Sequence, residues 1–161
     1  MKAEEVVNFV TKSAKEILEK LEFDAEISVE LVETEEGKKY IKVGITGDDL
    51  GLLIGFQGAT MKALEQILDL LTSRALKNNS SEDRYKVIVD VNDYKEKQEK
   101  NIRETAIRAI GQARESGQPI ELPSMNPAER RVVHMTVQEE DGVESESQGE
   151  EGERRVLIKP E

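Results

Sequence analysis

Two glycines lie three positions apart inside a mostly apolar stretch, and this spacing limits what the chain can fold into. The stretch runs from Leu52 to Met61, with Gly55 and Gly58 at its centre. Glycine has no Cβ, so it permits a tight turn and lets another molecule approach the backbone closely. A helix that begins at about Ala59 would direct its free N–H groups and the positive end of its dipole toward the loop, which favours phosphate. The stretch therefore predicts either a phosphate-binding loop or a structural corner between two helices.

Hydrophobic patterns on both sides of the glycine pair predict a small unit of helices and strands. Apolar residues recur at intervals of three and four over residues 3–21 and again from Ala59 to about Leu76, which is typical of amphipathic helices. Alternating apolar and polar residues predict strands, two of which form an antiparallel hairpin. The predicted order is a helix (3–21), two strands (25–31 and 41–45), a helical turn (50–54), the glycine pair, a helix (59–76) that ends at Asn78-Asn79-Ser80-Ser81, and a strand (85–91).

A second unit is predicted to follow, so that the two domains cover residues 1–92 and 93–161. It opens with a long helix that ends near Gly117, a residue that suits a C-terminal cap. Asn126-Pro127-Ala128-Glu129 predicts another helix start, because asparagine caps, proline fits the first turn and the glutamate can close a capping box. Both units belong to the α+β class, and the second ends in an edge strand and a basic strand (143–147 and 154–159).

The composition argues against several classes of protein. A net charge of −11 argues against broad, non-specific adhesion to nucleic acid. A local basic site remains compatible with that charge, because salt screens distant charges. No run approaches the roughly 18 apolar residues of a membrane span, no basic leader precedes an apolar stretch, and there is no cysteine. We therefore expect a cytoplasmic protein without disulfides, thiolate-bound metal or direct membrane insertion.

Two motifs, in this order, resemble a known family. The loop Ile54-Gly55-Phe56-Gln57-Gly58, placed between two helices, is similar to that of a KH domain of the prokaryotic, type II arrangement. Arg130-Arg131-Val132-Val133-His134 resembles the Arg-x-x-x-His motif of an R-three-H domain. Similarity extends over 125–134, 142–147 and 154–156. The ordered pair resembles the bacterial Jag family, also called the KhpB or SpoIIIJ-associated family. Members usually carry a lysine or arginine between the two glycines, where this chain has phenylalanine and glutamine.

For the first unit, the resemblance implies a groove for about four nucleotides of single-stranded RNA or DNA, with the loop against the phosphate backbone. The candidate binding residues are Ile54, Gly55, Phe56, Gln57 and Gly58. The glycines permit close approach, and Ile54 offers an apolar surface for bases. Phe56 has two interpretations: its ring stacks on a base or sugar, or it is an apolar plug packed against the hairpin.

For the second unit, the candidates are Arg130, Arg131, His134, Arg154 and Arg155. Arg130 and His134 are four positions apart and share a helix face, which we expect to be exposed. Both donate hydrogen bonds to phosphate, His134 when it is protonated. The alternative is that both pair with Glu129 or with the acidic segment after the helix, which would raise the pKa of His134 without any ligand. The side chain of Arg131 points about 100° away from that of Arg130 around the helix axis. Arg154 and Arg155 would extend the basic surface.

The sequence offers little support for catalysis, because the only histidine lies in the Arg-x-x-x-His motif and no metal-ligand spacing is present. We expect a binding protein without cofactor or metal rather than an enzyme. The resemblance implies single-stranded RNA or single-stranded DNA as ligand, leaves room for a second KH protein as partner, and implies an RNA chaperone or post-transcriptional regulator linked to cell envelope growth and division. The alternative is an acidic, KH-shaped protein-interaction adaptor with little RNA binding. A steep negative salt dependence of RNA binding would separate the two.

Overall fold

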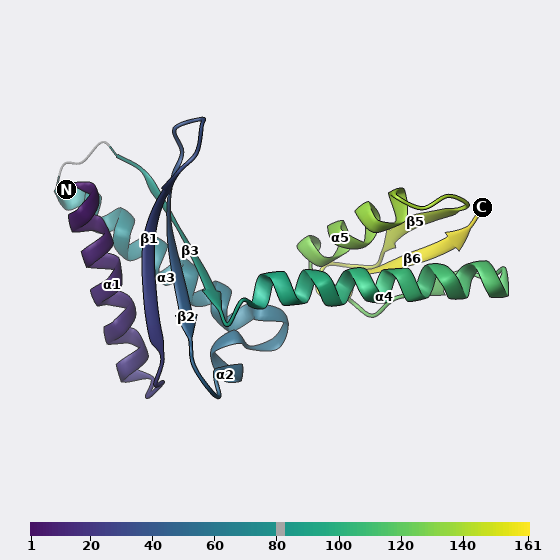
Figure 1. Ribbon diagram of the computed structural model, residues 1–161, viewed down its shortest axis with the longest axis horizontal. Coiled ribbons are helices and arrows are strands. Elements are labelled where there is room, and N and C mark those ends of the chain that lie inside the picture. The colour runs from purple at the N-terminus through teal and green to yellow at the C-terminus, as the bar shows by residue number, and fades with distance from the viewer. Residues whose placement is uncertain (80–82) are drawn as a thin grey trace. The chain divides into compact units, whose positions relative to one another are not determined.

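A computed structural model describes residues 1–79 and 83–161, and the chain divides into two compact units (Figure 1). Unit 1 covers Met1–Tyr94 and unit 2 covers Lys95–Glu161. Each unit has its own three-stranded sheet and its own apolar core. The predicted α+β class is confirmed.

Unit 1 contains the helices and strands that the hydrophobic patterns predict. The predicted end of the second long helix at Asn78-Asn79-Ser80-Ser81 lies partly outside the described residues. The elements are α1 (Ala3–Lys20), β1 (Glu26–Glu33), β2 (Lys39–Thr46), α2 (Gly51–Ile54), a 3-10 turn (Phe56–Gly58), α3 (Ala59–Asn78) and β3 (Tyr85–Val91).

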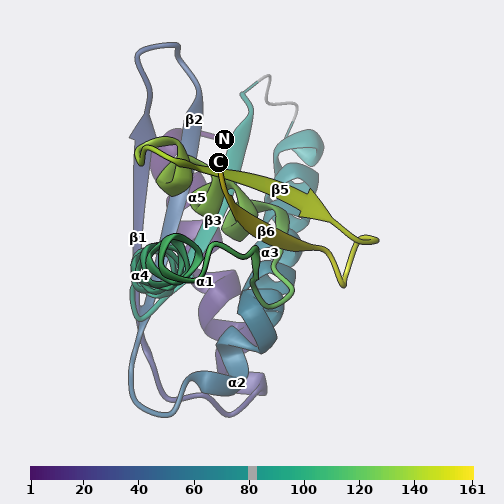
Figure 2. The ribbon, with the colours of Figure 1, turned by 90° about the vertical axis from the view of Figure 1, so that its right-hand side faces the viewer.

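The sheet of unit 1 has the order β1-β2-β3, so β3 is an edge strand. β1 and β2 pair antiparallel as predicted, whereas β2 and β3 pair parallel. Helices α1 and α3 lie on one face of this sheet, as both ribbon views show (Figures 1 and 2). Alternate residues of β2 and β3 therefore face the helices, and burying each such side chain contributes roughly 1.5–3 kcal/mol. The fully buried strand residues include Ile41, Ile45, Val87 and Val89, and the fully buried helix residues that complete this core include Val6, Val10 and Leu68.

The glycine pair forms the corner between α2 and α3. Gly55 has φ 74° and ψ −176°, a conformation that is essentially restricted to glycine. A Cβ on Gly55 would lie 2.2 Å from Thr60 Oγ1, and one on Gly58 would lie 2.9 Å from Tyr94 Cε1. Gly58, with φ 78°, immediately precedes α3, which begins at Ala59 as predicted. Both positions therefore need glycine for the fold itself.

Unit 2 also follows the predicted pattern. Its elements are α4 (Tyr94–Ser116, whose first residue belongs to unit 1), β4 (Ile120–Glu121), α5 (Pro127–Gln138), β5 (Val143–Gln148) and β6 (Arg155–Pro160). The sheet order is β4-β6-β5, with β6 antiparallel to both neighbours and β5 at an edge as predicted. Its core is built from the apolar faces of α4, α5 and β6, including Ala106, Ala113, Val133, Val156 and Ile158.

The start of α5 is the predicted capping box. Asn126 Oδ1 accepts a hydrogen bond from the Glu129 backbone N–H at 2.9 Å, and Glu129 Oε2 accepts one from the Asn126 backbone N–H at 3.0 Å. These two bonds satisfy N–H groups that a helix start leaves without partners. Across residues 1–79 and 83–161, no helix is both long enough and apolar enough to cross a membrane.

The conformation of Gly55 leads to the first prediction. Gly55→Ala should lower the free energy of unfolding of unit 1 by about 1–3 kcal/mol from the backbone conformation alone, with a further cost from displacing Thr60. Amide hydrogen exchange of β2, measured by NMR on the full chain, would report this loss. Gly51→Ala is the matched control, because a Cβ there meets no atom within 4 Å. Equal protection in the two variants would contradict the prediction.

Candidate nucleic-acid interface

The loop of unit 1 presents two apolar side chains to solvent. Leu53 is buried and Ile54 half-buried, so α2 is anchored by its last residues. Leu52 and Phe56, by contrast, are 82% and 83% exposed. The interpretation of Phe56 as a plug packed against the hairpin is therefore wrong. Its ring is free to contact another molecule.

The N-terminus of α3 opens onto this loop. Gly58 is the N-cap, and as a glycine it has no side chain that could accept a hydrogen bond from the first turn of the helix. The free N–H groups and the positive end of the helix dipole therefore face the position that a ligand on the loop would take. This arrangement favours an anion, as the sequence predicted for phosphate.

A cation next to the loop lies on α3 rather than between the glycines. Lys62 is exposed on the first turn of the helix and forms no ion pair within the part of the chain that the structure describes. It lies three and seven positions before Glu65 and Asp69, so the three share one side of the helix. Both carboxylates contact β3, which places Lys62 on the β3 side of α3. The sequence analysis missed this lysine because it searched only between the glycines, although helical spacing would have indicated it.

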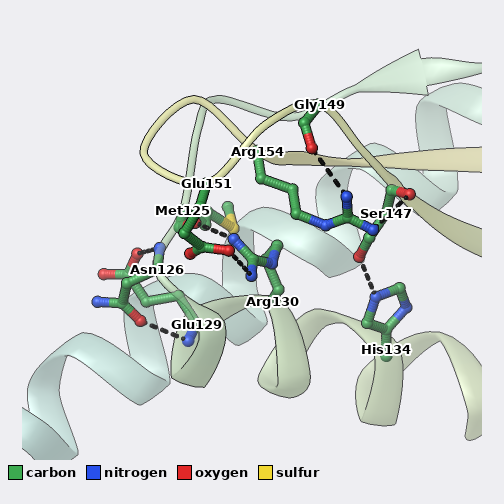
Figure 3. A network of polar contacts seen from close by, with 9 residues as sticks. All are labelled: Met125, Asn126, Glu129, Arg130, His134, Ser147, Gly149, Glu151 and Arg154. Atoms are coloured by element: carbon green, nitrogen blue, oxygen red, sulfur yellow. Dashed lines mark hydrogen bonds and ion pairs between the residues drawn. The ribbon is translucent and has the colours of Figure 1, made fainter.

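In unit 2, Arg130 is buried rather than exposed, with 8% of its surface accessible. Its Nη1 donates to the Met125 carbonyl at 2.8 Å, and its Nη2 lies 3.4 Å from a Glu151 carboxylate oxygen (Figure 3). The expectation of an exposed face for this side chain is therefore wrong. Arg130 shares its face with Val133 and Val137, which pack into the core of the unit. The contact with Glu151 matches the alternative in which the arginine pairs with the acidic segment.

His134 contacts two serines of β5 rather than a carboxylate. Nδ1 lies 2.7 Å from Ser145 Oγ, and Nε2 lies 2.7 Å from Ser147 Oγ. The second of these contacts is drawn in Figure 3. Partial burial, with a smaller contribution from the positive charge of Arg130, lowers the pKa of His134 below its ordinary value. The alternative that predicted a carboxylate partner and a raised pKa is wrong for this residue.

The remaining candidate arginines of unit 2 lie in different surroundings. Arg154 donates to the Gly149 carbonyl at 2.8 Å and to the Ser147 carbonyl at 3.2 Å (Figure 3). Arg155 pairs with Glu121 at 2.6 Å, and Arg131 is exposed. The fold thus brings Arg130, His134 and Arg154 together around the turn between β5 and β6. Arg131 and Arg155 lie outside that cluster.

Comparison with known proteins identifies the family. A family model described as the KhpA/KhpB KH domain matches residues 8–89. The chain belongs to this KH-domain family. A second model, that of the R-three-H domain, matches residues 100–160, so the Arg-x-x-x-His motif lies in an R-three-H domain. The resemblance inferred from the two motifs is confirmed.

Curated relatives cover most of this chain. RNA-binding protein KhpB of Clostridium symbiosum is 32% identical over 144 residues, which are 89% of this chain and 61% of the relative. RNA-binding protein KhpB of Bacillus subtilis is 32% identical over 130 residues, 79% of this chain and 59% of the relative. The Streptococcus pneumoniae serotype 2 protein of the same name is 28% identical over 158 residues, which are 98% of this chain and 45% of the relative. The chain therefore spans 45–61% of the length of these relatives.

Burial of Arg130 in the R-three-H domain leads to the second prediction. Arg130→Ala should destabilise unit 2 by about 1–3 kcal/mol, because the Met125 carbonyl loses its charged donor in a buried position. Arg131→Ala, the matched control, should change stability by no more than about 0.5 kcal/mol, since Arg131 is exposed. Hydrogen exchange of the β6 amides measures the stability of unit 2 in both variants. A cost for Arg130→Ala as small as that for Arg131→Ala would contradict the internal role.

The lowered pKa of His134 leads to the third prediction. Protonation favours the unfolded state, because the histidine binds a proton more tightly there than in the folded R-three-H domain. Stability of unit 2 should therefore fall as the pH drops below about 6.5, the ordinary pKa of histidine. Urea denaturation at pH 7.5, 6.5 and 5.5, followed by NMR signals of unit 2, tests this. In His134→Gln the free energy of unfolding should change less with pH over that window. An unchanged dependence on pH would mean that another group causes it.

Proposed function

We propose that this protein is a non-catalytic binding protein for single-stranded RNA. The observation that carries the proposal is the loop at Gly55–Gly58, whose Phe56 side chain is 83% exposed and which leads into the N-terminus of α3 in a KH domain of the KhpA/KhpB family. The curated relatives that cover both units are named RNA-binding proteins. RNA fits the loop better than a small anion does, because a phosphate-binding backbone and two exposed apolar side chains lie side by side.

In unit 1, we assign the phosphate backbone of the RNA to Gly55, Gln57 and Gly58, with Lys62 as a nearby cation. Gly55 is half-buried and lets a phosphate come close to the main chain, whereas Gly58 is buried. Lys62 takes the part of the basic residue that the loop lacks, because it is exposed one turn into α3. Phosphate contacts of this kind bind the strand without reading its sequence.

Phe56 and Ile54 supply the apolar part of the same interface. A side chain that is 83% exposed at the edge of a phosphate-binding loop is well placed to stack on a base or a ribose. Such stacking tolerates any base, because every base has a flat π-face. Ile54, half-buried at the end of α2, extends this surface.

In unit 2, we assign a second RNA contact to the R-three-H domain through Arg131, Arg130, His134, Arg154 and Arg155. Arg131 is the exposed member and requires no rearrangement. Arg130 already holds a carboxylate, that of Glu151, at 3.4 Å. Because that glutamate side chain is 69% exposed and the contact is long, a phosphate of RNA can replace it at low cost.

We further propose that the protein acts in the cytoplasm as an RNA chaperone or post-transcriptional regulator, the role that the family resemblance implies, with a link to cell envelope growth and division. A second KH protein is the proposed protein partner. The surface that favours such a partner is the outer side of α3, where Ile67, Leu70 and Leu71 are exposed on one helix. If RNA binding fails, this same surface supports the alternative of a protein-interaction adaptor.

The fourth prediction separates the roles of Phe56 and Lys62. Phe56→Ala should weaken binding of a single-stranded RNA by about 1–3 kcal/mol without changing the salt dependence, because stacking involves no counterions. Lys62→Ala should reduce the slope of log affinity against log salt by up to about 0.7, the value for one phosphate contact on a single strand. Fluorescence anisotropy at several salt concentrations measures both, with single-stranded DNA and duplex RNA as comparison ligands.

Controls for this titration come from α1 and its C-cap residue, Leu21. Leu21→Ala removes an apolar side chain that is 55% exposed, and Lys15→Ala removes a lysine from the surface of the helix. Neither should alter RNA affinity or its salt slope. Wild-type protein that binds no RNA, or binds without any salt dependence, would overturn the proposed function in favour of the adaptor.

A further inference from the structure

The hairpin of unit 1 fixes which backbone groups of β1 point away from the sheet. β1 ends the order β1-β2-β3, and Figure 2 shows it at one margin of the sheet. The Thr34 N–H donates to the Lys38 carbonyl at 2.9 Å, and this pair continues the register of β1 and β2. Hydrogen-bonded pairs alternate with non-hydrogen-bonded pairs in an antiparallel ladder, so the even-numbered residues of β1 bond to β2. The backbone groups of Ile27, Val29 and Leu31 therefore point outward.

The two edges of this sheet differ in how their outward groups are used. The Asn92 N–H donates to the Ile45 carbonyl at 2.9 Å, which agrees with the alternation because it directs the odd-numbered residues of β2 toward β3. At the β3 edge, the outward N–H groups of Val87 and Val89 donate to carboxylates of α3. At the β1 edge, no hydrogen bond within the described residues reaches the three outward N–H groups. One edge is occupied and the other is free.

The side chains of β1 form an apolar face and an acidic face. Ile27, Val29 and Leu31 are half-buried and pack against the core of unit 1. Glu26 and Glu30 are exposed on the opposite face, and neither forms an ion pair in the part of the chain that the structure describes. A strand added at this edge would extend both faces, because its side chains also alternate. Its apolar residues would continue the core, and the others would lie beside two carboxylates.

The pairing of β1 with β2 shows which residues β1 accepts as neighbours. Ile41 lies opposite Leu31 on the face that the helices cover, and Lys42 lies opposite Glu30 on the open face. Apolar pairs and pairs of opposite charge both stabilise neighbouring strands. A strand with the same alternation of apolar and basic residues therefore fits the free edge for the same physical reason.

The charges of β1 disfavour a second copy of this chain as the occupant. β1 has 8 residues without a proline, and its charged residues are Glu26, Glu30 and Glu33. Pairing with β1 of a second copy would gather the glutamates of both copies at one edge, where like charges on neighbouring strands are destabilising. The net charge of −11 adds to the repulsion between copies. A basic strand avoids both costs.

We propose that the outer edge of β1 is a docking site for an extended segment of a partner protein in which apolar residues alternate with lysine or arginine. The segment adds a fourth strand to the sheet. Main-chain hydrogen bonds to the three outward residues supply affinity, and Glu26 and Glu30 select basic side chains. This site lies on a strand outside the Gly55–Gly58 loop and needs no RNA, so it goes beyond the proposed function.

The test adds an acetylated and amidated heptapeptide of alternating lysine and valine to the full chain and follows amide hydrogen exchange by NMR. Strand addition should slow exchange at Ile27, Val29 and Leu31. It should leave Ser28 and Glu30 unchanged, because their N–H groups already bond to β2. A peptide held only by charge would not produce this alternation. The same peptide with glutamate in place of lysine should not bind.

Two variants test the backbone and the charges separately. Val29→Pro removes one outward N–H, and an edge strand tolerates proline where the N–H faces solvent, so the fold should persist while peptide binding is lost. Glu26→Lys/Glu30→Lys should weaken binding of the lysine peptide about tenfold and let the glutamate peptide bind, because two pairs of opposite charge become pairs of like charge. The matched control, Glu104→Lys/Glu115→Lys, makes the same charge change at exposed positions of α4 and should leave the preference for the lysine peptide unchanged.

Three outcomes would overturn the proposal. The first is absence of peptide binding, or equal protection of odd- and even-numbered residues of β1. The second is a preference for the lysine peptide that survives Glu26→Lys/Glu30→Lys. The third is alternating protection that appears without peptide and grows with protein concentration, since a second copy would then occupy the edge.

Discussion

The backbone of unit 1 turns at Gly55 and Gly58, and the placement of every side chain on α3 depends on that turn. Both glycines have positive φ, and side chains at these positions would collide with Thr60 and Tyr94. Because α3 then begins at Ala59, its apolar face meets the sheet while its first-turn N–H groups face the loop. The fold alone accounts for the two glycines. Substituting them would therefore disturb stability and binding together, whereas Phe56 and Lys62 report on binding.

The Arg-x-x-x-His motif of the R-three-H domain is first of all a structural element. Arg130 and His134 connect α5 to Met125, to the serines of β5 and to the turn that carries Glu151. Elsewhere in the described part of unit 2, cations are also paired, as in Arg103–Glu139, Arg114–Glu140 and Lys159–Glu146. A protein with a net charge of −11 thus keeps many of its cations next to carboxylates. RNA that reaches these sites must exchange with glutamates, which disfavours weak, non-specific attachment.

Backbone N–H groups at the β3 edge of the sheet in unit 1 are likewise already hydrogen-bonded within the protein. An edge strand offers free N–H and C=O groups to any other strand, and proteins commonly protect such edges. Asp69 and Glu65 do this for β3 by accepting from Val87 and Val89. An added strand therefore finds no free N–H group at Val87 or Val89.

Much of the fold could be predicted because it depends on near neighbours in the chain. The capping box of Asn126 and Glu129 spans three residues, and the helix start after Gly58 follows from the backbone freedom of two glycines. The alternation of buried and exposed residues in β2 and the apolar stripes of the helices likewise repeat over a few residues, so the sequence shows them directly. The two motifs were sufficient to identify the KhpA/KhpB family and the R-three-H domain.

The environments of the candidate site residues could not be predicted in the same way. Helical spacing placed Arg130 and His134 on one face, but whether that face is buried depends on how α5 packs. Arg130 meets Glu151, 21 residues later, and His134 meets serines 11 and 13 residues later. The sequence by itself determined which residues form each helix, strand and turn, because those preferences are local. Only the tertiary structure decided that Phe56 is exposed, that Arg130 is buried and that the β3 edge is occupied, because burial and pairing arise from contacts between distant parts of the chain.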